Sequence, residues 1–544
     1  MTKMKTLLGS LLAGGVLALI HLAFSKAGSS RSIPSGTSYD AVDEYVEAQM
    51  HRLRIPGASL AIVEGDRVMH YRGFGRVRPG GETPSPQTPF SIGSITKSFT
   101  ALAVMQLVEA GKVELDAPVQ RFLPWFRVAD PQASAQMTVR HLLNQTSGLP
   151  TSTGELIAVD FDNRPGAAER QTRVLSTLVL ARPVGSAYEY SNSNYQLLGL
   201  IVEAASGESY ADYVQEHILI PLDMRHSYTS LDMAKQDSLA VANLGVANQT
   251  VGHQYWFAIP FASSTKPLPC GALAGGGLVS CAEDMAHYLI AHLNGGRYEG
   301  VQILSGSGID ELHRGVADLG LEALPAELRP ARLWLRGLSL GRYGMGCFVD
   351  IIDQTKVVWH GGTLPDFFAY LALLPGQKKG VVLFFNADHH WMSPVLTEVG
   401  MGVAALLAGE QPAPLPFFRM IPWALRGLLL IPVLQTAGVV TTLRQLRRWH
   451  LDPERRPSGG CAWGRHLLLP LVPSLLFALT LLPMLGKRRG YLMLYKPDSS
   501  WLVLVCGTSA LVWSFLRTGL ILRAMKMASS HRTLGRQPVA RQGA

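Results

Sequence analysis

The sequence predicts an α+β domain followed by three membrane-spanning helices. Strand-like segments occur at both ends of the first part of the chain, at 58–65 and 67–75 and again at 343–352, 356–362, 367–375 and 379–387. The middle, from Ser94 to about Gly295, is dominated by helical patterns. Strands that are segregated from helices are typical of α+β domains. Apolar runs long enough to cross a bilayer follow Pro412.

The strand segments are separated by short polar turns. The first pair turns at Glu64-Gly65-Asp66, and a helix is expected before it over Tyr39–Leu53. Short turns join antiparallel neighbours, because a parallel pair needs a long crossover connection. We therefore expect one antiparallel sheet that is assembled from both ends of the chain.

Three regions are expected from hydropathy. Residues 1–27 have a basic start, an apolar run and small residues before Gly28, as in a signal peptide or an uncleaved N-terminal anchor. Residues 28–412 form the α+β domain. Residues 413–544 form a membrane domain with helices at about 420–443, 466–485 and 500–522, each near the ~20 residues that span a bilayer.

Charge is distributed unevenly along the chain. The net charge is +9, but the part from Pro412 onward holds 18 basic and 3 acidic residues, which leaves 31 basic and 37 acidic residues before it. The basic excess therefore belongs to membrane-flanking segments, which argues against a nucleic-acid partner. The Arg-rich loop 444–465 and the tail from Arg523 are expected in the cytoplasm, and the α+β domain outside it. The sequence 486–490, GKRRG, falls on the outer side in this topology.

The sequence SITK, Ser94 to Lys97, is the first candidate for chemistry. It begins an apolar, buried-type helix that Gly111 is expected to end. Residues three apart share a helix face, so Lys97 can reach the Ser94 hydroxyl, and burial would make the amine a base for that hydroxyl. The alternative is a helix N-cap at Ser94 and a surface lysine. A second S-x-x-K, Ser263 to Lys266, is followed by prolines that disfavour a helix.

Two further motifs lie in suitable contexts. Tyr190-Ser191-Asn192 precedes an apolar helix; a tyrosine can relay a proton when a cation favours its phenolate, and an amide can hold a substrate carbonyl. His360-Gly361-Gly362-Thr363 ends a strand segment, where two glycines permit close backbone approach and the Thr363 amide could join that of Ser94 as an oxyanion hole. Alone, each motif is more often a polar turn than a catalytic motif.

Together the three motifs resemble those of the penicillin-recognising serine hydrolases, which include class C β-lactamases, D-Ala-D-Ala carboxypeptidases and related esterases. The resemblance covers about Ser35 to Gly409 and includes the connectors HLLNQTSGLP, AGGGLVSCAEDMAHYL and YGMGCF. It implies a β-lactamase/transpeptidase-like fold, an antiparallel sheet flanked by helices plus a helical lobe, with the site in the cleft between them.

The resemblance also implies a role for each motif residue. Ser94 would be acylated, Lys97 and Tyr190 would move protons, Asn192 would orient the substrate amide, and the amides of Ser94 and Thr363 would hold the oxyanion. His360 and Gly362 would complete the substrate-binding strand. Such chemistry needs no metal and no cofactor.

His360 departs from the lysine of the β-lactamases. A histidine is largely neutral near pH 7, so strong binding of a β-lactam carboxylate is not expected. Esterases and aminopeptidases of the family commonly carry such a histidine, which favours an ester or a D-amino-acyl amide as substrate. The overall layout is similar to that of membrane-bound, prodrug-activating D-aminopeptidases such as the colibactin-maturation peptidase.

The expected partners are a membrane and a small-molecule or peptide substrate, with or without a lipid group. Two other functions stay open: a sensor or scaffold that is acylated without turnover, and a β-lactamase. The cysteines also leave two alternatives, a Cys270–Cys281 disulfide or free buried thiols at these positions and at Cys347.

Overall fold

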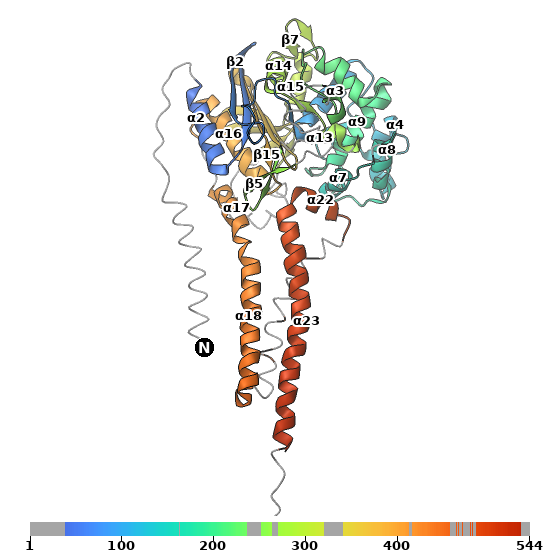
Figure 1. Ribbon diagram of the computed structural model, residues 1–544. Helices are drawn as coiled ribbons and strands as arrows, with labels where there is room; N and C mark the ends of the chain where they lie inside the picture. The colour runs from blue at the N-terminus through green and yellow to red at the C-terminus, as the bar shows by residue number, and fades with distance from the viewer. Residues whose placement is uncertain are drawn as a thin grey trace, which may run out of the picture.

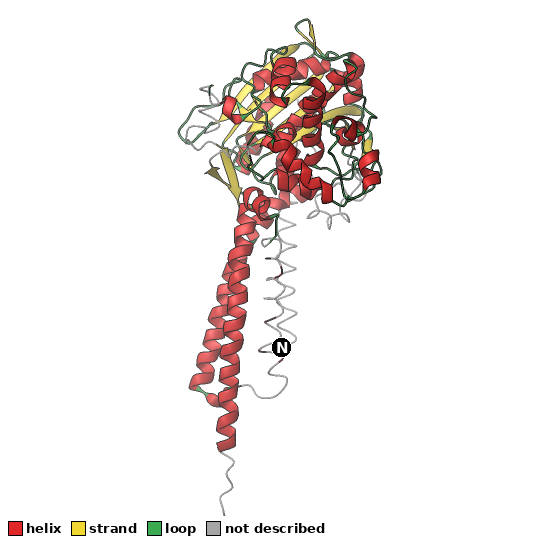
Figure 2. Ribbon diagram, turned by 90° about the vertical axis from the view of Figure 1, so that its right-hand side faces the viewer, coloured by secondary structure: helices red, strands yellow, loops and turns green. Residues whose placement is uncertain are grey.

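A computed structural model describes residues 39–534 apart from 163, 235, 237–251, 264–269, 320–340, 413–415 and all but a few positions of 457–485. A domain of sheet and helices sits at one end of two long helices (Figures 1 and 2). The predicted signal segment 1–27, Lys266 of the second S-x-x-K and most of the predicted membrane helix 466–485 lie outside the described residues.

An eight-stranded sheet organises the domain, in the order β2-β1-β14-β13-β12-β11-β10-β9. Each strand pairs antiparallel with its neighbours. The first hairpin, β1–β2, lies beside β14 and thus joins the two ends of the domain's sequence, as predicted. The strands are β1 (Gly57–Glu64), β2 (Arg67–Gly75), β9 (Ala317–Asp318), β10 (Arg342–Tyr343), β11 (Phe348–Ile352), β12 (Thr355–Thr363), β13 (Phe368–Leu374) and β14 (Lys379–Phe385).

Helices cover both faces of the sheet (Figure 1). Helices α2 (Asp40–Leu53) and α16 (Ser393–Ala408) bury their apolar sides against one face, and α14 (Ala282–Leu293) packs on the other. Because both faces are covered, β13 and the interior of β14 are buried along their length and read as continuous apolar runs.

The helical lobe lies beyond α14 and is formed by the middle of the sequence. Helix α9 runs through it and packs against α3, α6, α7, α8, α10 and α13. The lobe and its connections contain α3 (Thr96–Glu109), α4 (Val119–Phe122), α5 (Pro131–Gln136), α6 (Val139–Leu143), α7 (Thr151–Ile157), α8 (Ala167–Thr172), α9 (Asn192–Ser206), α10 (Tyr210–Val214), α11 (Leu231–Ala234), α13 (Leu273–Gly276) and α15 (Gly306–Leu312).

A small second sheet was not predicted. Strand β4 (Gly252–Trp256) pairs antiparallel with β5 (Ile259–Ser263) and parallel with β15 (Ala387–Asp388). Its hairpin turns at Phe257 and Ala258, which both have positive φ, 51° and 59°. Glycine or asparagine usually marks such a turn, so the sequence carries no turn signal here.

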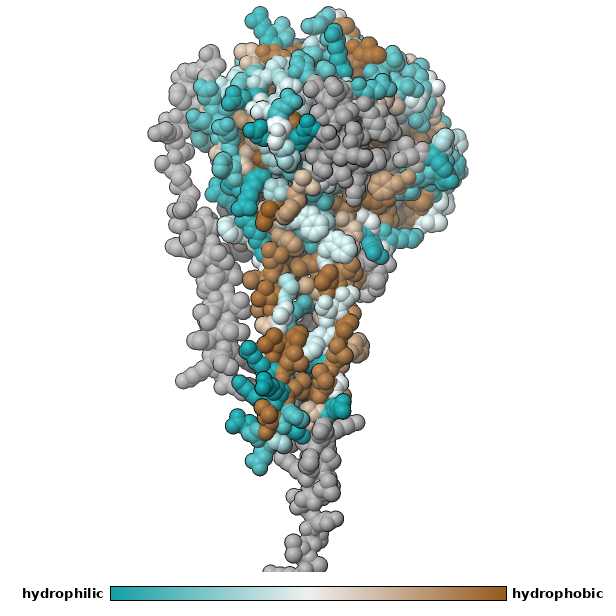
Figure 3. Space-filling view, in the orientation of Figure 1, coloured by the Kyte–Doolittle hydropathy of each residue, from teal (hydrophilic) through white to brown (hydrophobic). Residues whose placement is uncertain are grey.

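Two described helices are long and apolar enough to cross a membrane, Arg419–Leu451 and Pro497–Met525. They comprise α17 (Pro416–Gly427), α18 (Leu430–Leu451) and the first part of α23 (Pro497–Leu534); a short helix, α22 (Arg489–Tyr495), precedes α23. Large apolar side chains on both are exposed, for example Leu434 and Phe515, and Figure 3 shows apolar surface along them with a hydrophilic far tip. Two of the three predicted membrane spans therefore correspond to described helices. Most of the third, 466–485, lies outside the described residues.

The cysteines favour the second of the two alternatives. Cys281 and Cys347 are buried and free, and the Cys281 sulfur accepts a hydrogen bond from the backbone of Asp284. Cys281 therefore packs as part of the α14 N-terminus and does not form the disulfide with Cys270.

The backbone of strand β12 packs directly against the backbone of the turn that carries Ser94. A Cβ placed on Gly362 would lie 1.9 Å from the Ile92 carbonyl oxygen and 3.2 Å from the Ser94 nitrogen, whereas a Cβ on Gly361, on the opposite face, would meet nothing closer than Thr397 Oγ1 at 3.6 Å. Only the glycine at 362 is required by this approach.

We predict that Gly362→Ala destabilises the domain by about 1–3 kcal/mol, because the added methyl group overpacks the contact with Ile92. Gly361→Ala is the matched control, since it changes the same residue type in the same strand without a clash. Thermal unfolding of the two variants in detergent measures the difference. Equal melting temperatures would contradict this packing.

Candidate active site

The turn before α3 carries Ser94. Strand β3 (Phe90–Ser91) pairs with β6 (Val279–Ser280), and the chain then passes through a 3₁₀ turn, Gly93–Ile95, into α3. Gly93 has φ +52°, which favours glycine. Ser94 therefore lies in the 3₁₀ turn that leads into α3, at the start of the helix that the sequence predicted.

Lys97 lies one turn later and is fully buried. Its Nζ is 3.0 Å from Ser94 Oγ and donates a hydrogen bond of 2.6 Å to the Gly275 carbonyl of α13. Burial lowers the pKa of Lys97 to about 7 because the charged form is desolvated. The sequence interpretation of Lys97 as a surface residue is therefore wrong, and a large fraction of this amine is neutral near pH 7.

The backbone of the YGMGC turn helps to enclose Lys97. A Cβ on Gly346, which has φ +75°, would lie 2.6 Å from the Lys97 carbonyl oxygen. The chain after β10 thus packs directly on the first turn of α3. Gly275 and Gly346 were not identified as site residues from the sequence, although both lie in connectors that carried the family resemblance.

Tyr190, which lies just before α9, reaches the same hydroxyl. Its OH donates a hydrogen bond to Ser94 Oγ at 2.9 Å, and Lys97 Nζ lies 5.0 Å from the centre of its ring. Burial raises the pKa of Tyr190 well above its ordinary value, and the hydrogen bond with Ser94 offsets this only in part. The resting group is hence a neutral phenol, and the expectation of a phenolate favoured by a nearby cation does not hold.

Asn192 is the first residue of α9, and a buried polar network fixes the chain before it. Gln145, at positive φ, accepts through its Oε1 from the Ser191 backbone and from the Asn194 side chain. Asn192 Oδ1 is buried and has no hydrogen-bond partner among the described residues. Because an unpaired buried oxygen is unfavourable, this atom is suited to accept from a bound N–H group.

The backbones that carry the Ser94 and Thr363 amides lie next to each other. A Cβ on Gly93 would lie 3.0 Å from the Thr363 nitrogen, and a Cβ on Gly362 would lie 3.2 Å from the Ser94 nitrogen. The turn and the end of β12 thus bring close together the two amides that are predicted from the sequence to form an oxyanion hole.

His360, in β12, is buried among aromatic side chains. Its Nδ1 lies 2.7 Å from the Gly361 carbonyl, which requires a proton on that nitrogen, and its Nε2 lies 3.5 Å from the Tyr343 hydroxyl. Phe348 and Tyr190 contribute neighbouring rings. Burial, together with the positive charge of Lys97, lowers the pKa of His360 to about 3. His360 therefore supplies no positive charge at pH 7.

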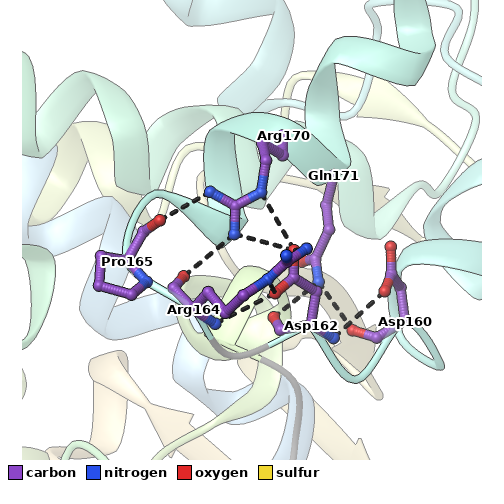
Figure 4. Close-up of polar contacts among 6 residues, drawn as sticks. All are labelled: Asp160, Asp162, Arg164, Pro165, Arg170 and Gln171. Carbon is purple, nitrogen blue, oxygen red and sulfur yellow. Dashed lines mark hydrogen bonds and ion pairs between the residues drawn. The ribbon is translucent and has the colours of Figure 1, made fainter.

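A charged network stiffens the connection between α7 and α8 on the lobe side (Figure 4). Asp162 accepts hydrogen bonds from Arg164 and Arg170, and the Gln171 amide donates to the carbonyls of Asp160 and Asp162. The Gln171 side chain lies against Gly271, where a Cβ would meet it. The network therefore supports the segment that leads into α13, whose Gly275 carbonyl binds Lys97.

Comparisons with known proteins identify the family of this chain. The family model named Beta-lactamase matches residues 42–398, more than half of the chain. The chain is 26% identical over 364 residues to "Protein flp" of Staphylococcus aureus (strain MW2), covering 66% of this chain and 65% of that relative's length. It is 29% identical over 340 residues to "Penicillin-binding protein 4" of Amycolatopsis lactamdurans, covering 61% of this chain and 81% of the relative.

Solved structures show the same fold. An octameric penicillin-binding protein homologue from Pyrococcus abyssi superposes with a TM-score of 0.57 at 27% identity, covering 70% of this chain and 80% of that one. SurE with D-Leu superposes with a TM-score of 0.51 at 23% identity, covering 69% and 76% of the two chains. The family model over residues 42–398, together with these relatives and solved structures, shows that the chain belongs to the β-lactamase family of penicillin-recognising serine hydrolases.

Proposed function

We propose that this protein is a membrane-anchored, extracytoplasmic hydrolase that forms an acyl-enzyme at Ser94. The observation that carries the proposal is the buried Lys97 amine, 3.0 Å from Ser94 Oγ and with a pKa near 7. A serine hydroxyl needs an adjacent base to become a nucleophile, and a neutral lysine provides one at physiological pH.

The proposed reaction has two halves. Ser94 Oγ bonds to the substrate's acyl carbon while its proton passes to Lys97, and the amides of Ser94 and Thr363 stabilise the developing oxyanion. Lys97 returns that proton through the Tyr190 hydroxyl to the leaving amine or alcohol as its bond to the acyl carbon breaks. Water then attacks the ester in the same way, which releases the acid and restores Ser94.

The proposed substrate is a D-amino-acyl peptide, an acylated prodrug or an ester. Asn192 Oδ1, buried and without a partner among the described residues, fits a substrate amide N–H. The neutral His360 and the rings around it favour an uncharged group where β-lactamases bind a carboxylate. The D-configuration rests on the family resemblance.

The exposed apolar helices α18 and α23 support the membrane anchor. Arg444, Arg447 and Arg448 lie in the last part of α18, which extends away from the domain (Figure 1). An arginine-rich end favours the cytoplasmic side, so the domain at the other end would face outward. Arg488, on the domain side, forms an ion pair with Glu155 of the domain, which accounts for one of the basic residues there.

A penicillin-binding sensor is the second candidate, because a relative 29% identical to this chain carries the name "Penicillin-binding protein 4". Its hallmark would be an acyl adduct that persists. A β-lactamase would instead turn over penicillins.

We predict that the full-length protein, incubated with N-acyl-D-amino-acyl amides, esters and penicillins, forms an adduct at Ser94 that decays as product appears. Intact mass spectrometry over time measures it, with Ser94→Ala as the control that forms none. Persistence of the adduct would favour the sensor, decay with penicillins alone would favour the β-lactamase, and wild-type turnover by Ser94→Ala would refute the proposal.

We also predict that the rate of Ser94 acylation rises with pH through about 7 and then levels. Lys97 must be neutral to accept the proton; below its pKa of about 7 it is protonated and cannot. His360, with a pKa of about 3, stays neutral over this range and adds no second step. Quenched-flow acylation between pH 5 and 9 checks this, and Lys97→Met should lose about 10²–10⁴-fold in rate. A flat profile would show that Lys97 is not the base.

A further inference from the structure

The segment 488–499 joins the two lobes of the catalytic domain from below. It comprises α22 and the start of α23, and in Figure 1 these lie between the domain and the long helices. The segment makes specific polar contacts with the helical lobe at its beginning and with the sheet side at its end. Each contact leads to a residue of the candidate active site.

On the lobe side, Arg488 donates to the buried carboxylate of Glu155 in α7. Helix α7 is in direct contact with the Tyr190–Asn192 segment. A Cβ on Gly154 would lie 2.6 Å from the Asn192 nitrogen, and the Thr151 hydroxyl donates to the Tyr190 carbonyl at 2.7 Å. The ion pair therefore holds the helix that backs Asn192.

On the sheet side, Asp498 at the start of α23 enters the domain. Its Oδ1 lies 3.0 Å from His389 Nε2, and both side chains are fully buried. Its Oδ2 accepts from the Phe257 backbone at 2.8 Å, in the turn between β4 and β5. Nearby, the Gln254 side chain donates to the Leu494 carbonyl at 2.7 Å. The first turn of α23 is thus anchored on the small sheet.

The small sheet also contacts the loop that follows Thr363. The backbone N–H of His253, in β4, donates to the Asp366 carbonyl at 3.3 Å, and the Leu364 N–H donates to the Phe367 carbonyl at 3.0 Å within the same loop. Contacts hence run from Asp498 through the β4–β5 hairpin to Asp366, three residues after Thr363.

We propose that residues 488–499 act as a clamp across the two lobes, with Arg488 and Asp498 as positioning residues that set the geometry of Asn192 and Thr363. The proposal rests on the proposed hydrolase function. In this account the membrane-side helices are part of the working site, and their role extends beyond tethering the domain.

The contacts of Arg488 and Asp498 can couple the segment 488–499 to Asn192 and Thr363. Leaving a buried carboxylate without its partner is unfavourable, so the carboxylates of Glu155 and Asp498 should keep Arg488 and His389 beside them. The site residues at the other ends, Asn192 and Thr363, act in different steps, amide recognition and oxyanion stabilisation. The two ends of the clamp should therefore leave different kinetic signatures.

The test uses the full chain in lipid nanodiscs with a substrate that acylates Ser94. Asp498→Asn should lower kcat about tenfold or more with little change in KM, since the oxyanion amides act in the transition state. Arg488→Glu should lower kcat/KM by a similar factor for amide substrates, and Glu155→Arg combined with Arg488→Glu should restore most of it. Arg489→Glu, one residue away and exposed, is the matched control and should match the wild type.

Wild-type kinetics in both Asp498→Asn and Arg488→Glu would overturn the clamp, while a Ser94-dependent adduct in the same samples would leave the hydrolase function standing. Failure of the charge-swapped pair to recover activity would likewise count against the Arg488 arm.

Hydrogen exchange provides a readout that needs no turnover. Relative to Arg489→Glu, amides of 190–194 should exchange faster in Arg488→Glu, and amides of 364–367 faster in Asp498→Asn, with the rest of the domain unchanged. Unchanged exchange in both segments would overturn the clamp even if no substrate is found. A uniform rise across the domain would also overturn it, because it would indicate general destabilisation.

Discussion

The burial of one amine, that of Lys97, is the constraint on which the site depends. Removing an ammonium from water is unfavourable, so the group reaches neutrality near pH 7 instead of carrying a charge. The surroundings are consistent with this. The described contacts of Nζ are a hydroxyl, a carbonyl and the rings of Tyr190 and Tyr195, and none of these is an ionised carboxylate that would restore the charge.

The fold provides that burial by bringing distant segments together. Helix α3 packs against α9 and α13, α13 supplies the Gly275 carbonyl, and the turn at Gly346 packs on the Lys97 backbone. Strand β12 then approaches the Ser94 turn so closely that residue 362 must be glycine. The proposed base, nucleophile and oxyanion amides thus depend on one set of backbone contacts, and a shift of β12 would disturb all three.

Much of the fold could be predicted from local signals. Short turns between 343 and 387 identified antiparallel neighbours, and the apolar sequence after Ser94 identified a buried helix. Spacing placed Lys97 beside Ser94. The structure adds Tyr190 and the glycine pair at 361–362 to the same place, as the order of motifs suggested.

What could not be predicted depends on long-range contacts. Gly275 and Tyr343 lie far from Ser94 in sequence, and no local pattern marks their contacts with Lys97 and His360. The β4–β5 turn uses Phe257 and Ala258 where glycine or asparagine is usual. The charge states also depend on burial, so the neutral phenol of Tyr190 followed only from the structure. Likewise, only the structure shows that Arg488, on the domain side, pairs with Glu155.

The most direct test of this account is the titration of Lys97 itself. NMR of protein labelled with ¹³C at the lysine Cε, with the Lys97 resonance assigned by its absence in Lys97→Arg, reports the charge state of each amine against pH. The account predicts a midpoint near 7 for Lys97. A Lys97 resonance that stays in its charged position up to pH 9 would contradict it, because the proposed base would then be protonated at physiological pH.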